Sequence, residues 1–206
     1  MRRRRYSDSS GCRLVLFAAA LFYAVTLAGC AAEGTTRILA GGYYGDYGPG
    51  RPVRHRGVDF DAFKGDPVIA ATDGTVVRVF VGYPCGSGIV VQHPVGETFW
   101  RTAYCHLDET NVQPGQQVKR GDVLGKVGTT GLTRGVPHLH FELHQPGDEP
   151  GATWTSWPGF DRIDPLPFIV GCFDPAKTVA YSTFEASGAK PRLVLTYPVR
   201  CGRLWR

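Results

Sequence analysis

The stretch PHLHFELH, residues 137–144, alternates polar and apolar side chains along its length. Because successive side chains of a β-strand point to opposite faces, one face would carry the ionisable side chains and the other the leucines and the phenylalanine. The ionisable side chains are those of His138, His140, Glu142 and His144. The alternation predicts a half-buried strand. Taken alone, such a face is more often solvated than metal-binding, so other parts of the chain must decide its role.

Short runs rich in valine, isoleucine and aromatic residues continue this β pattern from residue 53 to about residue 170. They read PVIAA, TVVRVFVG, GIVVQH, TFWRTAYCHL and VLGKVG, and glycines separate many of them. The Asp-Gly of TDGT, between the first two runs, is typical of a tight hairpin. No run in this region keeps a long helical apolar stripe. We therefore expect a mostly β domain, a small antiparallel β-sandwich or a partly closed sheet.

The first 29 residues resemble a bacterial lipoprotein signal peptide. Arg2–Arg5 and Arg13 form a basic front, an apolar run extends from Leu14 to Ala28, and LAGC at residues 27–30 is similar to a lipobox. The resemblance implies that residues 1–29 are removed and that Cys30 carries lipid. The alternative is an uncleaved membrane anchor, but the apolar run is shorter than the roughly 20 residues that span a bilayer.

The rest of the chain is nearly neutral and long enough for one domain. Removal of residues 1–29, with five arginines and one aspartate, lowers the formal net charge from +5 to +1. No basic tract interleaved with aromatic residues remains, which argues against a nucleic-acid partner. We expect a lipidated cysteine with a flexible tether over residues 30–52, the β domain over 53–170 and a C-terminal extension over 171–206.

The cysteines predict two disulfides. With Cys30 assigned to lipid and Cys12 to the signal peptide, an even number remains in an exported chain: Cys85, Cys105, Cys172 and Cys201. GIVVQH and TFWRTAYCHL flank the turn-like PVGE and suggest a hairpin centred near Val95. Paired positions in such a hairpin sum to about 190, which would set Cys85 directly across from Cys105. Elimination then pairs Cys172 with Cys201.

Two further segments carry residues suited to metal chemistry. HRGVDF places His55 four residues before Asp59, and YCHLD places His106 near the end of a strand. A catalytic zinc site uses nitrogen and carboxylate ligands and leaves one position for water. His55, Asp59 and one histidine of the HxH pair could supply three ligands. The other histidine of the pair would then lie with His106 beside the water.

The order and spacing of these segments resemble the lysostaphin-type (LytM-like) zinc endopeptidases, which cut peptidoglycan. The resemblance rests on HRGVDFDAFKGDPVIAATDGTVVRV, YCHLD, VQPGQQVKRGDVLGKVGTTG, PHLHFEL and DPLPFI, and it covers residues 55 to about 169. It implies that His55, Asp59 and His140 bind Zn²⁺ and that His106 and His138 are the catalytic histidines. It also implies a β-sandwich of the duplicated hybrid motif type, with a groove over the metal.

Two departures from the family pattern bear on the shape of that groove. Val136 stands between the usual glycine and proline before the HxH pair, and the loop over residues 145–163 is longer than typical. This loop carries Trp154 and Trp157, which could border a substrate groove. Loop tryptophans more often fold back onto their own scaffold.

Three ionisable residues lie outside the expected ligands and catalytic histidines: Glu142, His144 and His93. Glu142 either orients a metal ligand or is an ordinary strand-face carboxylate, in solvent or in an ion pair. For His144 and His93 we expect no bound ligand, since most histidines bind nothing.

Three other functions compete with the peptidase reading. Cys105 and His106 are neighbours on a strand and should point to opposite faces, which argues against a cysteine hydrolase. PGQQVKRGDVLGKVG resembles the hairpin of biotinyl and lipoyl carriers, but neither Lys119 nor Lys126 has the exposed tip that such carriers modify. A regulator that binds peptidoglycan and activates another cell-wall hydrolase remains open, because some relatives of this family have lost their metal ligands.

The expected location and partners follow from the N-terminal resemblance. A lipobox together with disulfides indicates the periplasm, and Ala31 after the lipidated cysteine resembles a signal for transfer to the outer membrane. The expected partners are peptidoglycan stem peptides, a membrane through the lipid anchor, and a cell-wall hydrolase or division protein. A D-alanyl to diaminopimelate cross-link is the expected bond, ahead of a glycine bridge.

Overall fold

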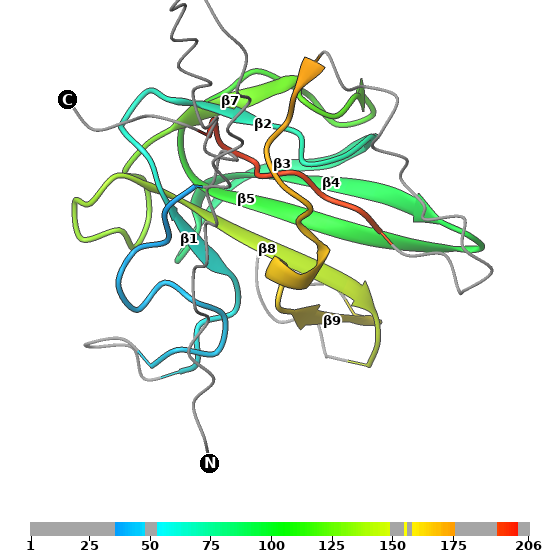
Figure 1. Ribbon diagram of the computed structural model, residues 1–206, viewed down its shortest axis with the longest axis horizontal. Coiled ribbons are helices and arrows are strands. Elements are labelled where there is room, and N and C mark those ends of the chain that lie inside the picture. The colour runs from blue at the N-terminus through cyan, green and yellow to red at the C-terminus, as the bar shows by residue number, and fades with distance from the viewer. Residues whose placement is uncertain (1–35, 48–52, 149–154, 156–157, 176–192, 202–206) are drawn as a thin grey trace, which may run out of the picture. The chain divides into compact units, whose positions relative to one another are not determined.

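The computed structural model describes residues 36–47, 53–148, 155, 158–175 and 193–201 (Figure 1). The expected signal peptide, Cys30, Ala31, Trp154 and Trp157 lie outside these residues. Within the described part of the chain, no helix is long and apolar enough to cross a membrane.

Antiparallel strands make up nearly all of the regular secondary structure in the described chain, which confirms the predicted mostly β fold class. They are β1 (Val58–Asp61), β2 (Pro67–Ile69), β3 (Gly74–Gly82), β4 (Gly86–Val95), β5 (Thr98–Thr110), β6 (Gln117–Val118), β7 (Val123–Val127), β8 (His138–Pro146) and β9 (Phe160–Ile163), followed by a 3₁₀ turn at Leu166–Phe168. The main path of pairing runs β1-β8-β5-β4-β3-β6, and β9 pairs with β8.

Strand β5 links this path to a second pair of strands. Its residues 101–105 pair with β8, whereas Leu107–Thr110 pair with β7, which in turn pairs with β2. Val68 of β2 and Leu124 of β7 belong to the same buried cluster as Ile89 and Phe141 of the main path. The main core therefore lies between β2–β7 and one face of the longer strands.

Residues on the C-terminal side of the predicted domain boundary complete this core. Leu193 and Leu195 are fully buried, and isolated bridges join Leu195 to Ile169 and Val199 to Val68. A disulfide between Cys172 and Cys201 closes this segment, with 5.8 Å between the Cα atoms. The described part of residues 171–206 thus packs as part of the domain.

Part of the segment expected to be a flexible tether is packed against β1. The backbone N–H groups of Leu39 and Asp59 donate to the carbonyls of Asp59 and Gly42, at 3.0 and 2.8 Å. A Cβ atom on Gly42 would lie 2.9 Å from the Asp59 Cβ, so glycine permits this close approach. The tether expectation is therefore wrong for these residues, because β1 offers them a free edge.

A disulfide joins Cys85 to Cys105, with 5.0 Å between the Cα atoms, but the expected hairpin register is wrong. Val95 pairs with Thr98, so the turn is the two-residue Gly96–Glu97 with Gly96 in the left-handed region (φ 60°). The hairpin is therefore centred after Val95. Cys85 precedes β4 and lies in the turn from β3, so the two cysteines are not a directly opposed pair on paired strands.

Candidate metal centre

Pairing between β1 and β8 brings the motifs HRGVDF and PHLHFELH together. His140 of β8 lies opposite Asp59 of β1, and His138 lies opposite Asp61. The intervening Leu139 belongs to the buried core on the other face, as the alternation predicts. His55 lies in the segment that leads into β1, four residues before Asp59.

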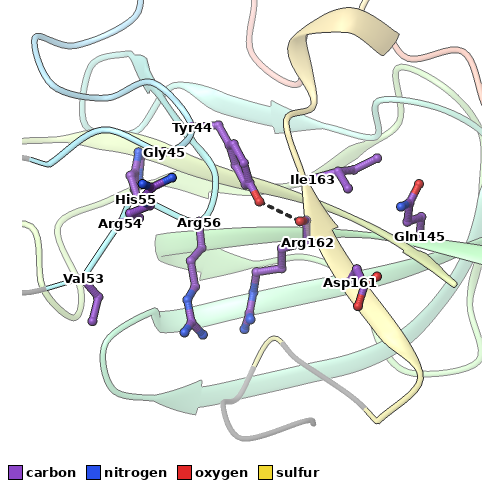
Figure 2. A pocket seen from close by; sticks show the side chains of 10 residues that line it. All are labelled: Tyr44, Gly45, Val53, Arg54, His55, Arg56, Gln145, Asp161, Arg162 and Ile163. Atoms are coloured by element: carbon purple, nitrogen blue, oxygen red, sulfur yellow. Dashed lines mark hydrogen bonds between the residues drawn. The ribbon is translucent and has the colours of Figure 1, made fainter. Parts of the chain in front are cut away.

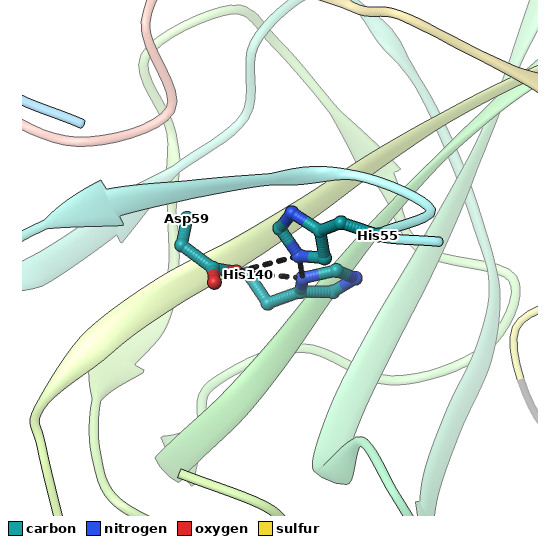
Figure 3. Close-up of side chains that lie close together, drawn as sticks. All are labelled: His55, Asp59 and His140. Carbon is teal, nitrogen blue, oxygen red and sulfur yellow. Dashed lines mark hydrogen bonds and ion pairs between the residues drawn. The ribbon is translucent and has the colours of Figure 1, made fainter. Parts of the chain in front are cut away.

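One polar atom from each of His55, Asp59 and His140, the trio, converges on a single point (Figure 3). Asp59 Oδ1 lies 2.8 Å from His140 Nδ1 and 3.1 Å from His55 Nε2, and the two histidine nitrogens are 2.9 Å apart. His55 and Asp59 are buried, and the His140 side chain is 13% exposed. The arrangement brings together residues that are far apart in the sequence.

The outer nitrogen of each histidine in this trio has its own acceptor. His55 Nδ1 lies 3.0 Å from the Tyr43 carbonyl, and His140 Nε2 lies 3.1 Å from Glu142 Oε1. These acceptors place a proton on each outer nitrogen and leave a lone pair on each inner one. Two lone pairs and a carboxylate oxygen then face one another, an arrangement that requires a cation or a shared proton. The donor set fits Zn²⁺ with an open coordination position.

The charges of the trio are strongly coupled in the absence of a metal. Burial raises the pKa of Asp59, but hydrogen bonds with His140 and His55 outweigh burial and hold that pKa well below its ordinary value. Burial lowers the pKa of His140, whereas Asp59 and Glu142 raise it, to a net value of about 9. The carboxylate thus stays ionised and attracts positive charge, so a bound metal would displace a proton from this point.

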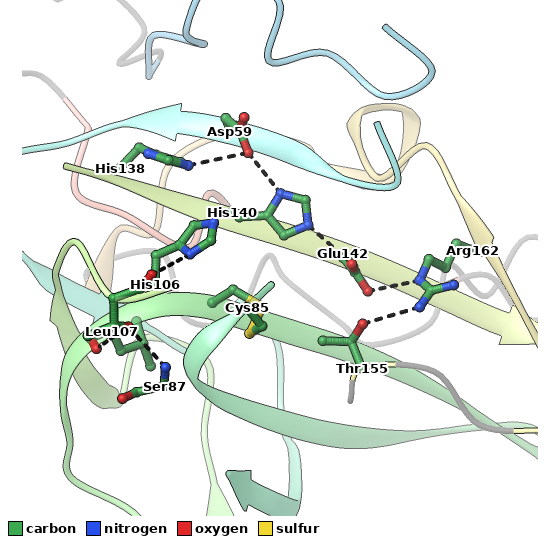
Figure 4. The surroundings of a disulfide bond; sticks show 12 residues. Asp59, Cys85, Ser87, His106, Leu107, His138, His140, Glu142, Thr155 and Arg162 are labelled. Carbon is green, nitrogen blue, oxygen red and sulfur yellow. Dashed lines mark hydrogen bonds and ion pairs between the residues drawn. A yellow bond between two sulfur atoms is a disulfide. The ribbon is translucent and has the colours of Figure 1, made fainter. Parts of the chain in front are cut away.

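His138 and His106 flank the trio with the same kind of outer hydrogen bond. His138 Nδ1 lies 2.9 Å from the Val136 carbonyl, and its Nε2 lies 3.7 Å from Asp59 Oδ1. His106 Nδ1 lies 2.8 Å from the Thr130 carbonyl, and its ring centroid is 4.8 Å from that of His138. Burial, followed by the charges of His140 and His138, lowers the pKa of His106 to about 3. Figure 4 shows both rings beside Asp59 and His140.

Comparison with known proteins agrees with this geometry. The model of peptidase family M23 matches residues 53–151. The solved catalytic domain of lysostaphin from Staphylococcus simulans is 33% identical, and the match covers 61% of this chain and 87% of that domain with a TM-score of 0.50. The chain belongs to peptidase family M23. This confirms the resemblance read from the sequence.

Two further M23 relatives show how much of the chain is shared. LytU is 32% identical over 65% of this chain and 84% of the solved chain, with a TM-score of 0.53. The peptidoglycan DD-endopeptidase ShyB of Vibrio cholerae is 42% identical over 94 residues, which are 46% of this chain and 21% of that protein. The chain therefore spans about a fifth of the length of this curated relative.

A buried polar cluster centred on Glu142 lies next to the trio (Figure 4). Glu142 Oε1 accepts from His140, while Oε2 lies 2.9 Å from His144 Nε2 and accepts from Arg162 Nε at 3.1 Å. Arg162 also donates to the Thr155 hydroxyl at 3.2 Å. Burial raises the pKa of Glu142, but the hydrogen bonds with His140 and His144 hold it well below its ordinary value.

This cluster settles the role of Glu142 and adds one residue that the sequence did not indicate. Glu142 is buried and holds His140, so it is not a solvated carboxylate. His144 lies outside the trio but supports Glu142. Arg162 is brought opposite His144 by the pairing of β8 with β9. No local motif marks Arg162, because its partner lies on another strand.

The glycine of HRGVD has a direct steric role. A Cβ atom on Gly57 would lie 2.4 Å from the Phe141 carbonyl oxygen and 2.9 Å from His140 Cε1. Real Cβ atoms do not approach other atoms that closely. Gly57 therefore allows the His140 ring to lie against the backbone between His55 and Asp59.

A cavity of about 530 Å³ opens beside the trio, and His55 forms part of its wall (Figure 2). Arg54 and Arg56 line it from the segment before β1, and Asp161 lines it from β9. Tyr44 forms another part of the wall, where its hydroxyl donates to the Arg162 carbonyl at 2.7 Å. The cavity thus reaches His55, and its wall carries three arginines and one aspartate.

Proposed function

We propose that this M23 domain is a zinc-dependent endopeptidase that hydrolyses peptide cross-links of peptidoglycan during cell-wall remodelling. The observation that carries this proposal is the convergence of His55 Nε2, Asp59 Oδ1 and His140 Nδ1, three atoms of metal-binding type that lie close together. Two more histidines lie beside this point. The names of relatives such as ShyB support the substrate class.

His55, Asp59 and His140 would hold the zinc. When bound, zinc lowers the pKa of its water to roughly 7 and polarises the carbonyl of the peptide bond. His138 and His106 each keep Nδ1 bonded to a backbone carbonyl, so the proton-accepting atom of each ring is Nε2. With zinc in place, one ring would accept the proton of the water at Nε2 and return it to the leaving amine, and the other ring would lie beside the oxyanion.

The cavity beside His55 supports a substrate that carries carboxylates. Arg54 and Arg56 give its rim positive charge, which suits stem peptides with free carboxyl groups. We propose a D-alanyl to diaminopimelate cross-link as the bond that is cut. The name of ShyB, a DD-endopeptidase, supports this choice over a glycine bridge.

The proposed location is the periplasm, with Cys30 lipidated and the anchor in the outer membrane. This part of the proposal rests on the LAGC segment and on Ala31. The two disulfides agree with an oxidising compartment. Partners would be stem peptides, the membrane through the anchor, and a cell-wall hydrolase or division protein.

Digestion of purified sacculi by residues 31–206, followed by mass spectrometry of the fragments, tests the activity. Wild-type protein should remove cross-linked dimers, whereas chelator-treated protein and the His140→Ala variant should not. Zinc added back to the chelated sample should restore cleavage, which separates loss of metal from damage to the protein. Absence of cleavage by folded, zinc-loaded protein would contradict the proposal and favour the regulator of another hydrolase.

A further inference from the structure

His106 lies at a break in the alternation of β5. Tyr104 and Leu107 both belong to the main buried core, although they are three residues apart. Cys105 lies in a second buried cluster with Val90 and Ala103. Residues three apart on a regular strand point to opposite faces. An extra residue is therefore accommodated between Tyr104 and Leu107.

The pairing with β4 locates this extra residue. Ile89 pairs with Tyr104 and Ser87 pairs with Leu107, so one residue of β4 faces both Cys105 and His106. His106 has a φ of 67°, in the left-handed region that residues with a side chain rarely adopt. The feature is a β-bulge, and it turns His106 from the core face toward the face of the metal-binding residues.

The disulfide between Cys85 and Cys105 anchors this bulge (Figure 4). Cys105 directly precedes His106, and the Cys85 carbonyl accepts the backbone N–H of His106 at 2.8 Å. The residue of β4 that faces the bulge is Gly88, where a Cβ atom would lie 2.7 Å from Cys85 Sγ. The small residue leaves room for the disulfide at this place.

A loop packs against the same turn and holds the ring of His106. The Thr130 carbonyl accepts from His106 Nδ1. The Thr130 hydroxyl accepts the N–H of Ser87 and donates to the Leu107 carbonyl, each at 2.9 Å. A Cβ atom on Gly86 would lie 2.4 Å from that hydroxyl oxygen, so the turn and the loop are in direct contact.

We infer that the Cys85–Cys105 disulfide is a positioning element for His106, because it holds the bulge that brings this histidine beside His138 and His140. The kinetic consequence rests on the proposed function, whereas the orientation of His106 belongs to the chain alone. The zinc ligands are held by other contacts, from β1, β8, the Tyr43 carbonyl and Glu142. Loss of the disulfide should therefore impair turnover more than zinc binding.

The test compares two double variants of the full chain in detergent, Cys85→Ser with Cys105→Ser and Cys172→Ser with Cys201→Ser. For each we would measure zinc content, the melting temperature, and kcat and KM on a cross-linked muropeptide dimer. A further readout is the rate at which diethyl pyrocarbonate modifies His106 in metal-free protein, followed by mass spectrometry. The second pair is a matched control, because it removes a disulfide away from β5.

We expect loss of the first disulfide to lower kcat by about 10- to 100-fold. KM and zinc content should change less than twofold, and His106 should be modified several times faster. The control should lower the melting temperature without these effects. Equal kcat in the two variants, or loss of zinc together with kcat, would overturn the inference. If wild-type protein cleaves nothing, the proposed function fails, and the rate of His106 modification still decides the orientation.

A milder variant covers the case in which the first double variant does not fold. Thr130→Val removes the hydroxyl that bridges Ser87 and Leu107, whereas Thr130→Ser keeps it. The valine variant should show lowered kcat and faster modification of His106, and the serine variant should restore both. The same kcat and the same rate of His106 modification in the two variants would contradict the role assigned to the Thr130 hydroxyl.

Discussion

Gly57 shows how an absent side chain shapes the trio of His55, Asp59 and His140. The His140 ring occupies the space that a Cβ atom on Gly57 would need. The motif HRGVD therefore carries two of the proposed ligands and the space for a third. Ligand spacing alone would not reveal this, because the third proposed ligand comes from β8.

Gly57→Ala should weaken zinc affinity by at least about 10-fold, since the ring of His140 must move away from His55 and Asp59. Competition with a chromophoric chelator measures the Kd. Gly115→Ala is the control, because Gly115 has a φ of 88° and open space around it. This control should lose about 1 kcal/mol of stability and keep its zinc affinity. Wild-type affinity in the Gly57 variant would contradict the steric argument.

Glu142 would act on the proposed zinc through its hydrogen bond with His140. Glu142→Gln should weaken zinc affinity by about 10- to 100-fold, because the amide holds His140 without the negative charge and disturbs the contacts with His144 and Arg162. The same chelator competition checks this. Glu109→Gln removes an exposed carboxylate paired with Lys126 and should leave the affinity unchanged. Similar affinities for the two variants would show that Glu142 does not support the site.

At the scale of elements, the segment before the domain contributes to the site. Residues 37–42 bond to β1, residues 45 and 46 bond to the backbone of His55, and the Tyr43 carbonyl accepts from His55 Nδ1. Because this contact is made by the backbone, the identity of the side chain at this position does not reveal it. The composition of the segment, rich in glycine and tyrosine, predicted a tether instead.

A chain that begins at residue 48 should bind zinc more weakly than one that begins at residue 33, because His55 loses its acceptor and β1 loses a neighbouring segment. Isothermal titration of the metal-free proteins measures the difference. Tyr43→Ala in the longer chain keeps the carbonyl and should bind like wild type. Equal affinities of the two chain lengths would indicate that the segment packs without supporting His55.

Strands were more predictable than their registers. The alternation of residues 137–144 correctly predicted β8 and its two faces, because side-chain period is a local property. The hairpin of β4 and β5 was misplaced because the turn begins at Gly96, and the bulge at His106 was missed. Bulges depend on the partner strand, so alternation within one strand does not locate them.

At the scale of the whole molecule, a histidine outside the site makes stability depend on pH. His93 is fully buried, with Nδ1 2.7 Å from the Asp73 carbonyl and Nε2 2.9 Å from the Thr102 hydroxyl. Burial is the main cause that lowers its pKa to about 4, helped by the charge of Arg120. Its role is structural, because both ring nitrogens bond to residues outside the candidate metal centre.

Because the folded pKa of His93 is below that of the unfolded chain, the unfolded state binds more protons between about pH 4 and 6.5. The stabilisation is complete above pH 6.5 and is lost as the pH falls, by about 3 kcal/mol in all. Urea unfolding of metal-free protein at pH 7.5 and 4.5 checks this. His93→Gln should reduce the difference between the two pH values, and an unchanged difference would contradict the assignment.

The sequence by itself determined the β class, the family and the residue types of the candidate site, because side-chain alternation and short motifs are local properties. Only the tertiary structure decided which atoms meet. His55 and His140 are 85 positions apart and converge through the pairing of β1 with β8. The Tyr43 carbonyl, Arg162 and the face on which His106 lies depend likewise on contacts between distant segments, and the physical reason is that backbone acceptors and strand bulges leave no mark in local side-chain patterns.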